Sequence, residues 1–142
     1  KSDHKVEADI WSATSINQLY RDGMECDRWN LLHPEESPRS AYVSQQLNAQ
    51  STPVICATDY IKAYGEQLRP YIDGRYVVLG TDGYGRSDTR AKLREHFEVD
   101  RYYVTVAALK ALSDEGKIAA SVVSKAIADY GLDAEKISPM HR

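Results

Sequence analysis

The chain has 142 residues and a net charge of −3, with acidic and basic side chains interspersed along its length. This length predicts a single domain, residues 1–142, that buries roughly 70% of its unfolded surface. The charge excludes the broad basic surface that nucleic-acid binding needs, and no apolar run approaches the roughly 18 residues of a membrane span. We therefore expect neither nucleic acid nor a membrane as a partner.

The two cysteines, Cys26 and Cys56, lie far apart in sequence, and neither belongs to a CxxC pair. This pattern favours two reduced, partly buried thiols in a cytoplasmic protein, with a disulfide or a metal ligand as the alternative. No signal peptide opens the chain, which agrees with that location.

The N-terminal residues predict an edge strand over 6–11. Apolar Val6, Ala8 and Ile10 alternate with acidic residues, which is the period of a strand with one wet face. We expect this strand to join the same sheet as the strands that follow.

Helical periodicity begins after the predicted edge strand. A helix capped by Thr14 or Ser15 is expected to end at Gly23, and a second, short helix is expected to stop before Pro34. An irregular loop over 35–39 and one or two helical turns over 41–47 complete this part of the chain.

Two apolar runs, residues 54–57 and 76–79, predict strands that are buried on both faces of a parallel sheet. Between them, Ile61, Tyr64, Leu68 and Ile72 form a helical stripe, which Thr58 or Asp59 is expected to cap. This order predicts a right-handed strand–helix–strand crossover with the two strands side by side.

The C-terminal third is predicted to be helical. Asp100 is expected to cap a helix over 101–115 that Gly116 closes, and a second helix is expected to end at Gly131. Residues 132–142 are interpreted as a tail, frayed from Ser138 onwards.

The stretch GTDGYGRSDTR, residues 80–90, follows the second buried strand and is called the 80–90 turn below. Ser87 and Asp88 are good N-caps for the next helix, which Arg86 and Arg90 flank. These four residues are the candidate site for an anion or a neighbouring domain. The simpler interpretation is a structural turn in which Asp82 and Asp88 cap backbone and the arginines pair with acids.

No self-sufficient catalytic centre is evident. The GTDGYG segment matches neither the dinucleotide fingerprint nor a P-loop, the four histidines lack metal-ligand spacing, and no serine lies in a GxSxG elbow. Asp59 and Asp82 follow the buried strands, where paired carboxylates can do acid–base chemistry, although capping explains both more simply. Tyr42, Tyr84 and Tyr103 lie off the core-facing stripes, so an interdomain or subunit contact competes with plain surface placement.

Three motifs carry a family resemblance: RWNLLHP at 28–34, ATDY at 57–60 and GTDGYGRSDTR at 80–90. With their surroundings they resemble, in order and almost end to end, the C-terminal region of the homodimeric pyruvate dehydrogenase E1 component, a thiamine diphosphate-dependent family of the transketolase superfamily. The resemblance implies a three-layer, doubly wound α/β domain with a mostly parallel sheet.

The resemblance also implies a division of labour. In that family the full chain decarboxylates pyruvate on thiamine diphosphate, with magnesium bridging the diphosphate, and passes the acetyl group to the lipoyl group of the E2 component. The cofactor lies between two domains that precede this region. We therefore expect this chain to have no catalytic, cofactor-binding or metal-binding residue, and to support the dimer together with the remaining E1 domains and the second E1 subunit.

The family domain opens with a strand and a helix before the segment that matches 6–11, and this chain starts at the end of that helix. We expect it to lack the first strand and most of the first helix, as a truncated or proteolysed piece of a longer E1 chain. The alternative is a non-catalytic module whose 80–90 turn binds an anion or a partner domain. A related E1 that acts on another 2-oxo acid is a further alternative, because substrate choice resides in the absent domains.

Overall fold

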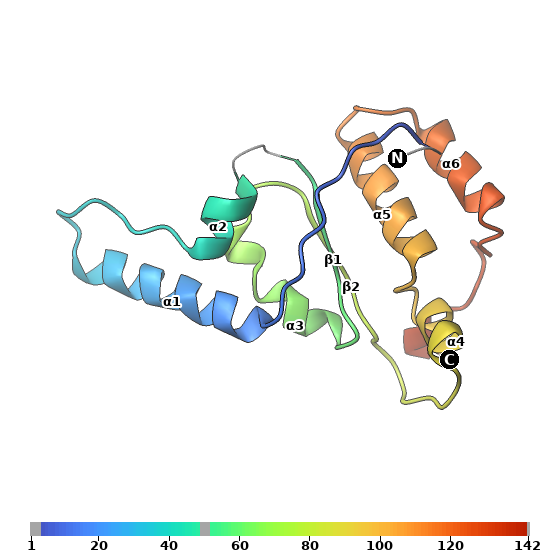
Figure 1. The fold of residues 1–142 in the computed structure, drawn as a ribbon, viewed down its shortest axis with the longest axis horizontal. Helices are drawn as coiled ribbons and strands as arrows, with labels where there is room; N and C mark the ends of the chain where they lie inside the picture. Colours follow the sequence, from blue (N-terminus) through green and yellow to red (C-terminus); the bar gives the residue numbers. More distant parts are fainter. Residues whose placement is uncertain (1–3, 49–51, 142) are drawn as a thin grey trace.

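The computed structural model describes residues 4–48 and 52–141, which form a small parallel sheet with helices on both faces (Figure 1). The described strands are β1 (Val54–Ala57) and β2 (Tyr76–Leu79). The helices α1 (Ile16–Leu32), α2 (Tyr42–Leu47) and α3 (Lys62–Glu66) lie on one side, and α5 (Arg101–Asp114) and α6 (Ala120–Asp129) lie on the other. The predicted α/β class is confirmed.

The two strands pair in parallel, as predicted, from Val54 opposite Tyr76 to Ala57 opposite Leu79. Alternate side chains of a strand point to opposite faces, and the face with Tyr76 and Val78 is buried against α1, α2 and α3. The opposite face, where α5 packs, is only half-buried. The prediction that both faces of the strands are buried is therefore wrong, because α5 covers the second face of the sheet only in part.

The crossover between the strands is more broken than the predicted single helix. It consists of α3 followed by the 3₁₀ turn η2 (Arg69–Tyr71), in which Pro70 occupies one of the first positions. Proline cannot donate the backbone hydrogen bond that would continue α3, so the helix ends before it. Leu68 and Ile72 are buried as the stripe predicts, whereas Ile61 is 55% exposed because it precedes α3.

The predicted edge strand over 6–11 is wrong. This segment is extended but is assigned to no strand, and Ile10 is 96% exposed. Val6 instead packs against the cluster formed by α5 and α6. Ala8 and Ile10 are exposed like the acidic residues between them, and within the described residues only β1 and β2 form a ladder.

Helix α1 is one continuous helix, and the predicted break at Gly23 is wrong. Ser15 caps its start by accepting a hydrogen bond from the backbone nitrogen of Gln18, and the helix ends just before His33, as predicted from Pro34. Gly23 lies buried in its middle, where a β-carbon would overlap the ring of Tyr71. This glycine is explained by close packing rather than by termination.

The C-terminal helices follow the prediction closely. Asp100 caps α5 through the backbone nitrogens of Tyr102 and Tyr103, at 2.9 and 3.0 Å. Helix α6 ends at Asp129, Gly131 follows with a φ of +63°, and the nitrogen of Leu132 donates to the carbonyl of Ile127. This is the glycine-ended C-cap that the sequence indicates.

Most of the buried hydrophobic side chains in the described residues form two clusters that share no residue. One cluster joins α1, α2 and the crossover to the sheet, and the other joins α5 to α6. The first contains Ile16, Ala41, Val43, Leu68, Tyr71, Ile72, Tyr76 and Val78, and the second contains Leu109, Val123 and Ala126.

Tyr76, in the first cluster, is expected to make the free energy of unfolding depend on pH. Burial raises the pKa of its hydroxyl above the ordinary value, and the hydroxyl donates a 2.9 Å hydrogen bond to the carbonyl of Gly65. A raised folded-state pKa stabilises the fold below the unfolded pKa, near 10, and this contribution is lost as the pH rises further. We expect Tyr76→Phe to cost about 1 kcal/mol at neutral pH and to flatten the alkaline fall in the free energy of unfolding.

Urea unfolding at neutral pH and above about pH 10 measures this effect. The exposed Tyr84 supplies the matched control, because Tyr84→Phe should leave the alkaline fall unchanged. If the free energy of unfolding falls equally steeply at alkaline pH for Tyr76→Phe and for the unmodified chain, Tyr76 is not the source of the pH dependence.

Candidate functional site

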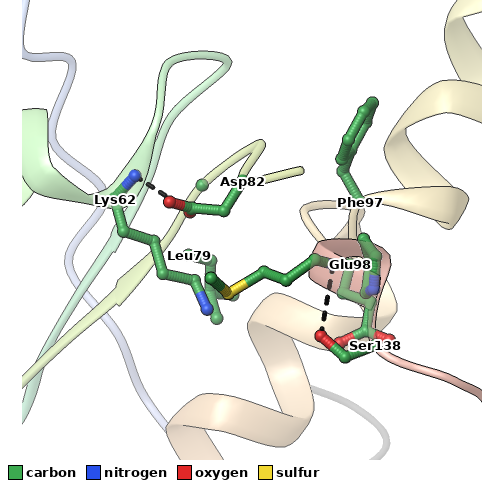
Figure 2. Close-up of a pocket in the computed structure, with 9 residues that line it drawn as sticks. Lys62, Leu79, Asp82, Phe97, Glu98 and Ser138 are labelled. Carbon is green, nitrogen blue, oxygen red and sulfur yellow. Dashed lines mark hydrogen bonds between the residues drawn. The ribbon is translucent and has the colours of Figure 1, made fainter. Parts of the chain in front are cut away.

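The 80–90 turn begins at the carboxyl end of β2 and is fixed to the connection that follows β1. The backbone nitrogen of Thr81 donates to the carbonyl of Tyr60 at 2.9 Å, and its hydroxyl donates to the carbonyl of Asp59, also at 2.9 Å. The carboxylate of Asp82 accepts a 3.0 Å hydrogen bond from the backbone nitrogen of Lys62, at the start of α3 (Figure 2). The predicted capping role of Asp82 is confirmed, and the helix that it caps is α3.

The second half of the turn leads into α4 (Arg90–His96). Thr89 caps this helix, with its hydroxyl 3.4 Å from the backbone nitrogen of Lys92. The predicted caps, Ser87 and Asp88, lie outside the capping position, because the helix starts later than its polar signals suggest. Asp88 accepts a 2.7 Å hydrogen bond from the backbone nitrogen of Thr89 instead, so its predicted contact with backbone is confirmed.

The four candidate residues Arg86, Ser87, Asp88 and Arg90 are all exposed. Within residues 4–48 and 52–141, no ion pair joins Arg86 or Arg90 to an acid, so the predicted pairing of these arginines is wrong there. The turn therefore presents two guanidinium groups to its surroundings, next to the exposed ring of Tyr84.

A small pocket of about 50 Å³ lies behind the turn (Figure 2). Lys62, Leu79 and Asp82 lie on one side of it, and Phe97, Glu98 and Ser138 lie on the other. Gly80, Pro139 and Met140 complete its lining. Sites for small molecules and cofactors occupy roughly 300–1,000 Å³, so this pocket does not fit thiamine diphosphate.

The two carboxylates that follow the strands do not form an acid–base pair. Asp82 is engaged at the start of α3, whereas the carboxylate of Asp59 lies 3.8 Å from Nε of Arg94 and is 66% exposed. Arg94 belongs to α4, so this ion pair connects α4 to the end of β1. Capping by Asp59 is a wrong prediction, because its carboxylate faces α4 rather than a helix start.

Residues 133–141, named the C-terminal strap here, pack against both the turn and α4, and the prediction of a frayed end is wrong for the described part of it. Pro139 is buried in the 3₁₀ turn η3 (Pro139–His141), and a β-carbon on Gly83 would overlap its carbonyl. Nζ of Lys136 donates to the carbonyls of Glu95 and His96 at 3.0 and 2.9 Å. Single contacts of this kind leave no periodic pattern in the sequence, so the sequence does not predict the packing of the strap.

The three tyrosines outside the predicted stripes divide into two kinds. Tyr42 and Tyr84 are 55% and 80% exposed, which leaves both accessible. Tyr103 is half-buried on α5, where Nζ of Lys136 lies 5.5 Å from the centre of its ring. Burial raises the pKa of Tyr103, and the nearby carboxylate of Glu98 adds to the effect. Tyr103 therefore belongs to an internal contact.

The remaining candidate groups are placed as follows. Cys26 and Cys56 are free and half-buried, as predicted, and burial raises the pKa of both thiols. In the described part of the chain, no three histidine, cysteine, aspartate or glutamate side chains are grouped so as to hold a metal ion. None of the described helices combines the length and apolarity needed to cross a membrane.

A comparison of the sequence with models of protein families identifies the family of this chain. The model of the transketolase-like TK C-terminal domain matches residues 1–100. The chain belongs to this family of transketolase-like C-terminal domains.

Similar proteins with curated names are pyruvate dehydrogenase E1 components. The component of Cupriavidus necator is 55% identical over 140 residues, and that of Pseudomonas aeruginosa is 51% identical over 141 residues. The component of Escherichia coli K12 is 50% identical over 138 residues. These matches cover 96–99% of this chain but only 15–16% of each relative.

Proposed function

We propose that this chain is the C-terminal domain of a pyruvate dehydrogenase E1 component and that its role there is structural. The observation that carries the proposal is 55% identity to the Cupriavidus necator component across 99% of the chain. The whole protein would decarboxylate pyruvate on thiamine diphosphate with magnesium and transfer the acetyl group to the lipoyl group of E2. Two free, half-buried thiols fit a reducing compartment, which supports a cytoplasmic location.

Within that protein, the chain supplies a scaffold rather than catalytic groups. We place thiamine diphosphate and magnesium in the other domains of that protein, and the pocket behind the 80–90 turn, at about 50 Å³, is too small for the cofactor. We infer that the 80–90 turn contacts one of those domains or the second subunit through Arg86, Ser87, Asp88 and Arg90. Exposed guanidinium groups beside the exposed Tyr84 are the residue types that interfaces favour.

A chimera tests the proposal directly. We expect the Cupriavidus necator enzyme, with its matching 140 residues replaced by this chain, to dimerise and to keep its pyruvate dehydrogenase activity within about tenfold, because 55% of the exchanged residues are identical. Activity assays and sedimentation measure the outcome. A chimera that dimerises and binds cofactor but turns over no pyruvate would contradict a purely structural role.

The same chimera tests the turn. Arg86→Ala combined with Arg90→Ala should weaken assembly roughly tenfold or more if these charges meet a buried partner group. Arg28→Ala is the matched control, because Arg28 is an exposed arginine that belongs to α1 rather than to the turn. Equal assembly of the two variants would remove Arg86 and Arg90 from the interface.

A non-catalytic anion-binding module is the second candidate, and it is favoured by Arg86 and Arg90, which are exposed and form no ion pair with any acid among the described residues. Calorimetric titration of the chain with inorganic phosphate, and separately with thiamine diphosphate and magnesium, separates the two functions. Saturable phosphate binding that Arg86→Ala abolishes would support the second candidate. Saturable binding of the cofactor would contradict the division of labour proposed above.

A further inference from the structure

We propose that the C-terminal strap, residues 133–141, holds the 80–90 turn in its conformation and that Lys136 is the anchor of this strap. The inference deepens the proposed function, on which it rests only for the identity of what the turn contacts. It rests on three sets of contacts: those within the end of α4, those between Lys136 and that end, and those between the strap and the turn.

The first set of contacts lies at the end of α4. The nitrogens of Glu98 and Val99 donate to the carbonyls of Glu95 and Arg94, at 3.3 and 3.0 Å, which is the pattern of a Schellman cap. The residue that adopts the left-handed conformation in this cap is normally glycine, but here it is Glu98, with a φ of +61°. A non-glycine residue in this conformation costs free energy, so the cap needs support from its surroundings.

Lys136 gives that support. Its ammonium group donates to the carbonyls of Glu95 and His96 and lies 3.4 Å from the carboxylate of Glu98. Its side chain is only 17% exposed. A cation placed at the final carbonyls of a helix is favoured by the negative end of the helix dipole. One lysine therefore satisfies the end of α4 and pairs with the strained Glu98.

The strap then continues from Lys136 to the turn. Ser138 starts η3, because its carbonyl accepts a 2.9 Å hydrogen bond from the nitrogen of His141. This brings the carbonyl of buried Pro139 against Gly83, where a β-carbon would overlap it. Gly83 itself has a φ of +121°, which favours glycine. Figure 2 shows Ser138 below Glu98, across the pocket from Asp82.

The turn is therefore held from two sides. Asp82 and Thr81 attach it to the connection after β1, and the strap closes it from the side of α4. When Lys136 no longer binds α4, the strap loses its anchor and the Gly83 segment loses the contact with Pro139. The orientation of Arg86 and Arg90 then depends on a side chain some 50 residues further along the chain.

Hydrogen exchange in the full-length protein, read by mass spectrometry, tests this coupling. Lys136→Met removes the ammonium group and keeps most of the stem. We expect roughly tenfold faster exchange in the peptide that contains residues 81–85, at the Thr81 amide that donates to the carbonyl of Tyr60, because the charge-assisted hydrogen bonds of the anchor are lost. Lys136→Arg keeps the charge and donors and should remain close to the unmodified protein. Lys125→Met is the matched control, because Lys125 also pairs with an acid, Asp129, but belongs to α6.

The reverse substitution tests the same contact from the turn. Gly83→Ala leaves Lys136 in place, and we expect it to speed exchange at Met140 and His141 in η3. The proposal is overturned if Lys136→Met leaves exchange at 81–85 equal to that of Lys125→Met, whether or not the strap itself loosens. Because exchange needs no pyruvate, cofactor or E2, a failed coupling is distinguishable from a failed functional assignment, which the chimera reports.

Discussion

Leu109→Ala is expected to lower the free energy of unfolding by about 2–5 kcal/mol, one of the two largest effects that we predict. Leu109 is 2% exposed and packs with Val123 and Ala126 between α5 and α6. Truncation to alanine removes buried methyl groups and leaves a cavity that helices with such small contact residues cannot readily close. Urea unfolding of the chain, followed by circular dichroism, measures the loss.

The matched control is Leu31→Ala. Leu31 is a helical leucine near the end of α1, and it is 78% exposed. Its truncation should change the free energy of unfolding by no more than about 0.5 kcal/mol. Similar losses for the two variants would show that Leu109 is not a core residue.

Gly23→Ala is the second large effect, with an expected loss of about 1–3 kcal/mol. In most helix interiors this change would stabilise by about 1 kcal/mol, because alanine has the higher helix propensity. At Gly23 the added methyl group would overlap the ring of Tyr71, which is buried and donates a 2.7 Å hydrogen bond to the carboxylate of Asp27. The ring is therefore held at both its face and its hydroxyl.

A double-mutant cycle identifies the cause. With Tyr71→Ala in the background, the methyl group at position 23 has space, and Gly23→Ala should become stabilising by up to about 1 kcal/mol. Urea unfolding of the unmodified chain, the two single variants and the double variant gives the coupling free energy between positions 23 and 71. A stabilising Gly23→Ala in the unmodified chain would contradict the close packing.

The sequence was informative where local signals agree with tertiary structure. The apolar runs of β1 and β2 predicted a parallel pair, and Asp100 and Gly131 predicted helix ends that the structure has. These elements are specified by residues that lie next to one another. The prediction at Gly23 failed because the same residue type serves both termination and close packing, and only the distant Tyr71 decides between them.

The candidate site shows the same division. Its position after β2 follows from the strand and the glycines, and the capping role of Asp82 follows from its position in the turn. The helix that Asp82 caps lies 20 residues earlier, and the carbonyls that Lys136 binds lie about 40 residues earlier. Contacts of this kind join single residues across long loops, so no periodicity marks them.

The division of the buried side chains into two clusters has a consequence for how the domain opens. Between the two clusters, α5 packs on the half-buried face of the sheet, and Arg75 pairs with Asp114 of α5 at 3.2 Å. The α5–α6 pair can therefore separate as one cooperative unit while α1 and the crossover keep their own packing. In a larger assembly, we expect such a domain to unfold in part, at the boundary between α5 and the sheet, before it unfolds completely.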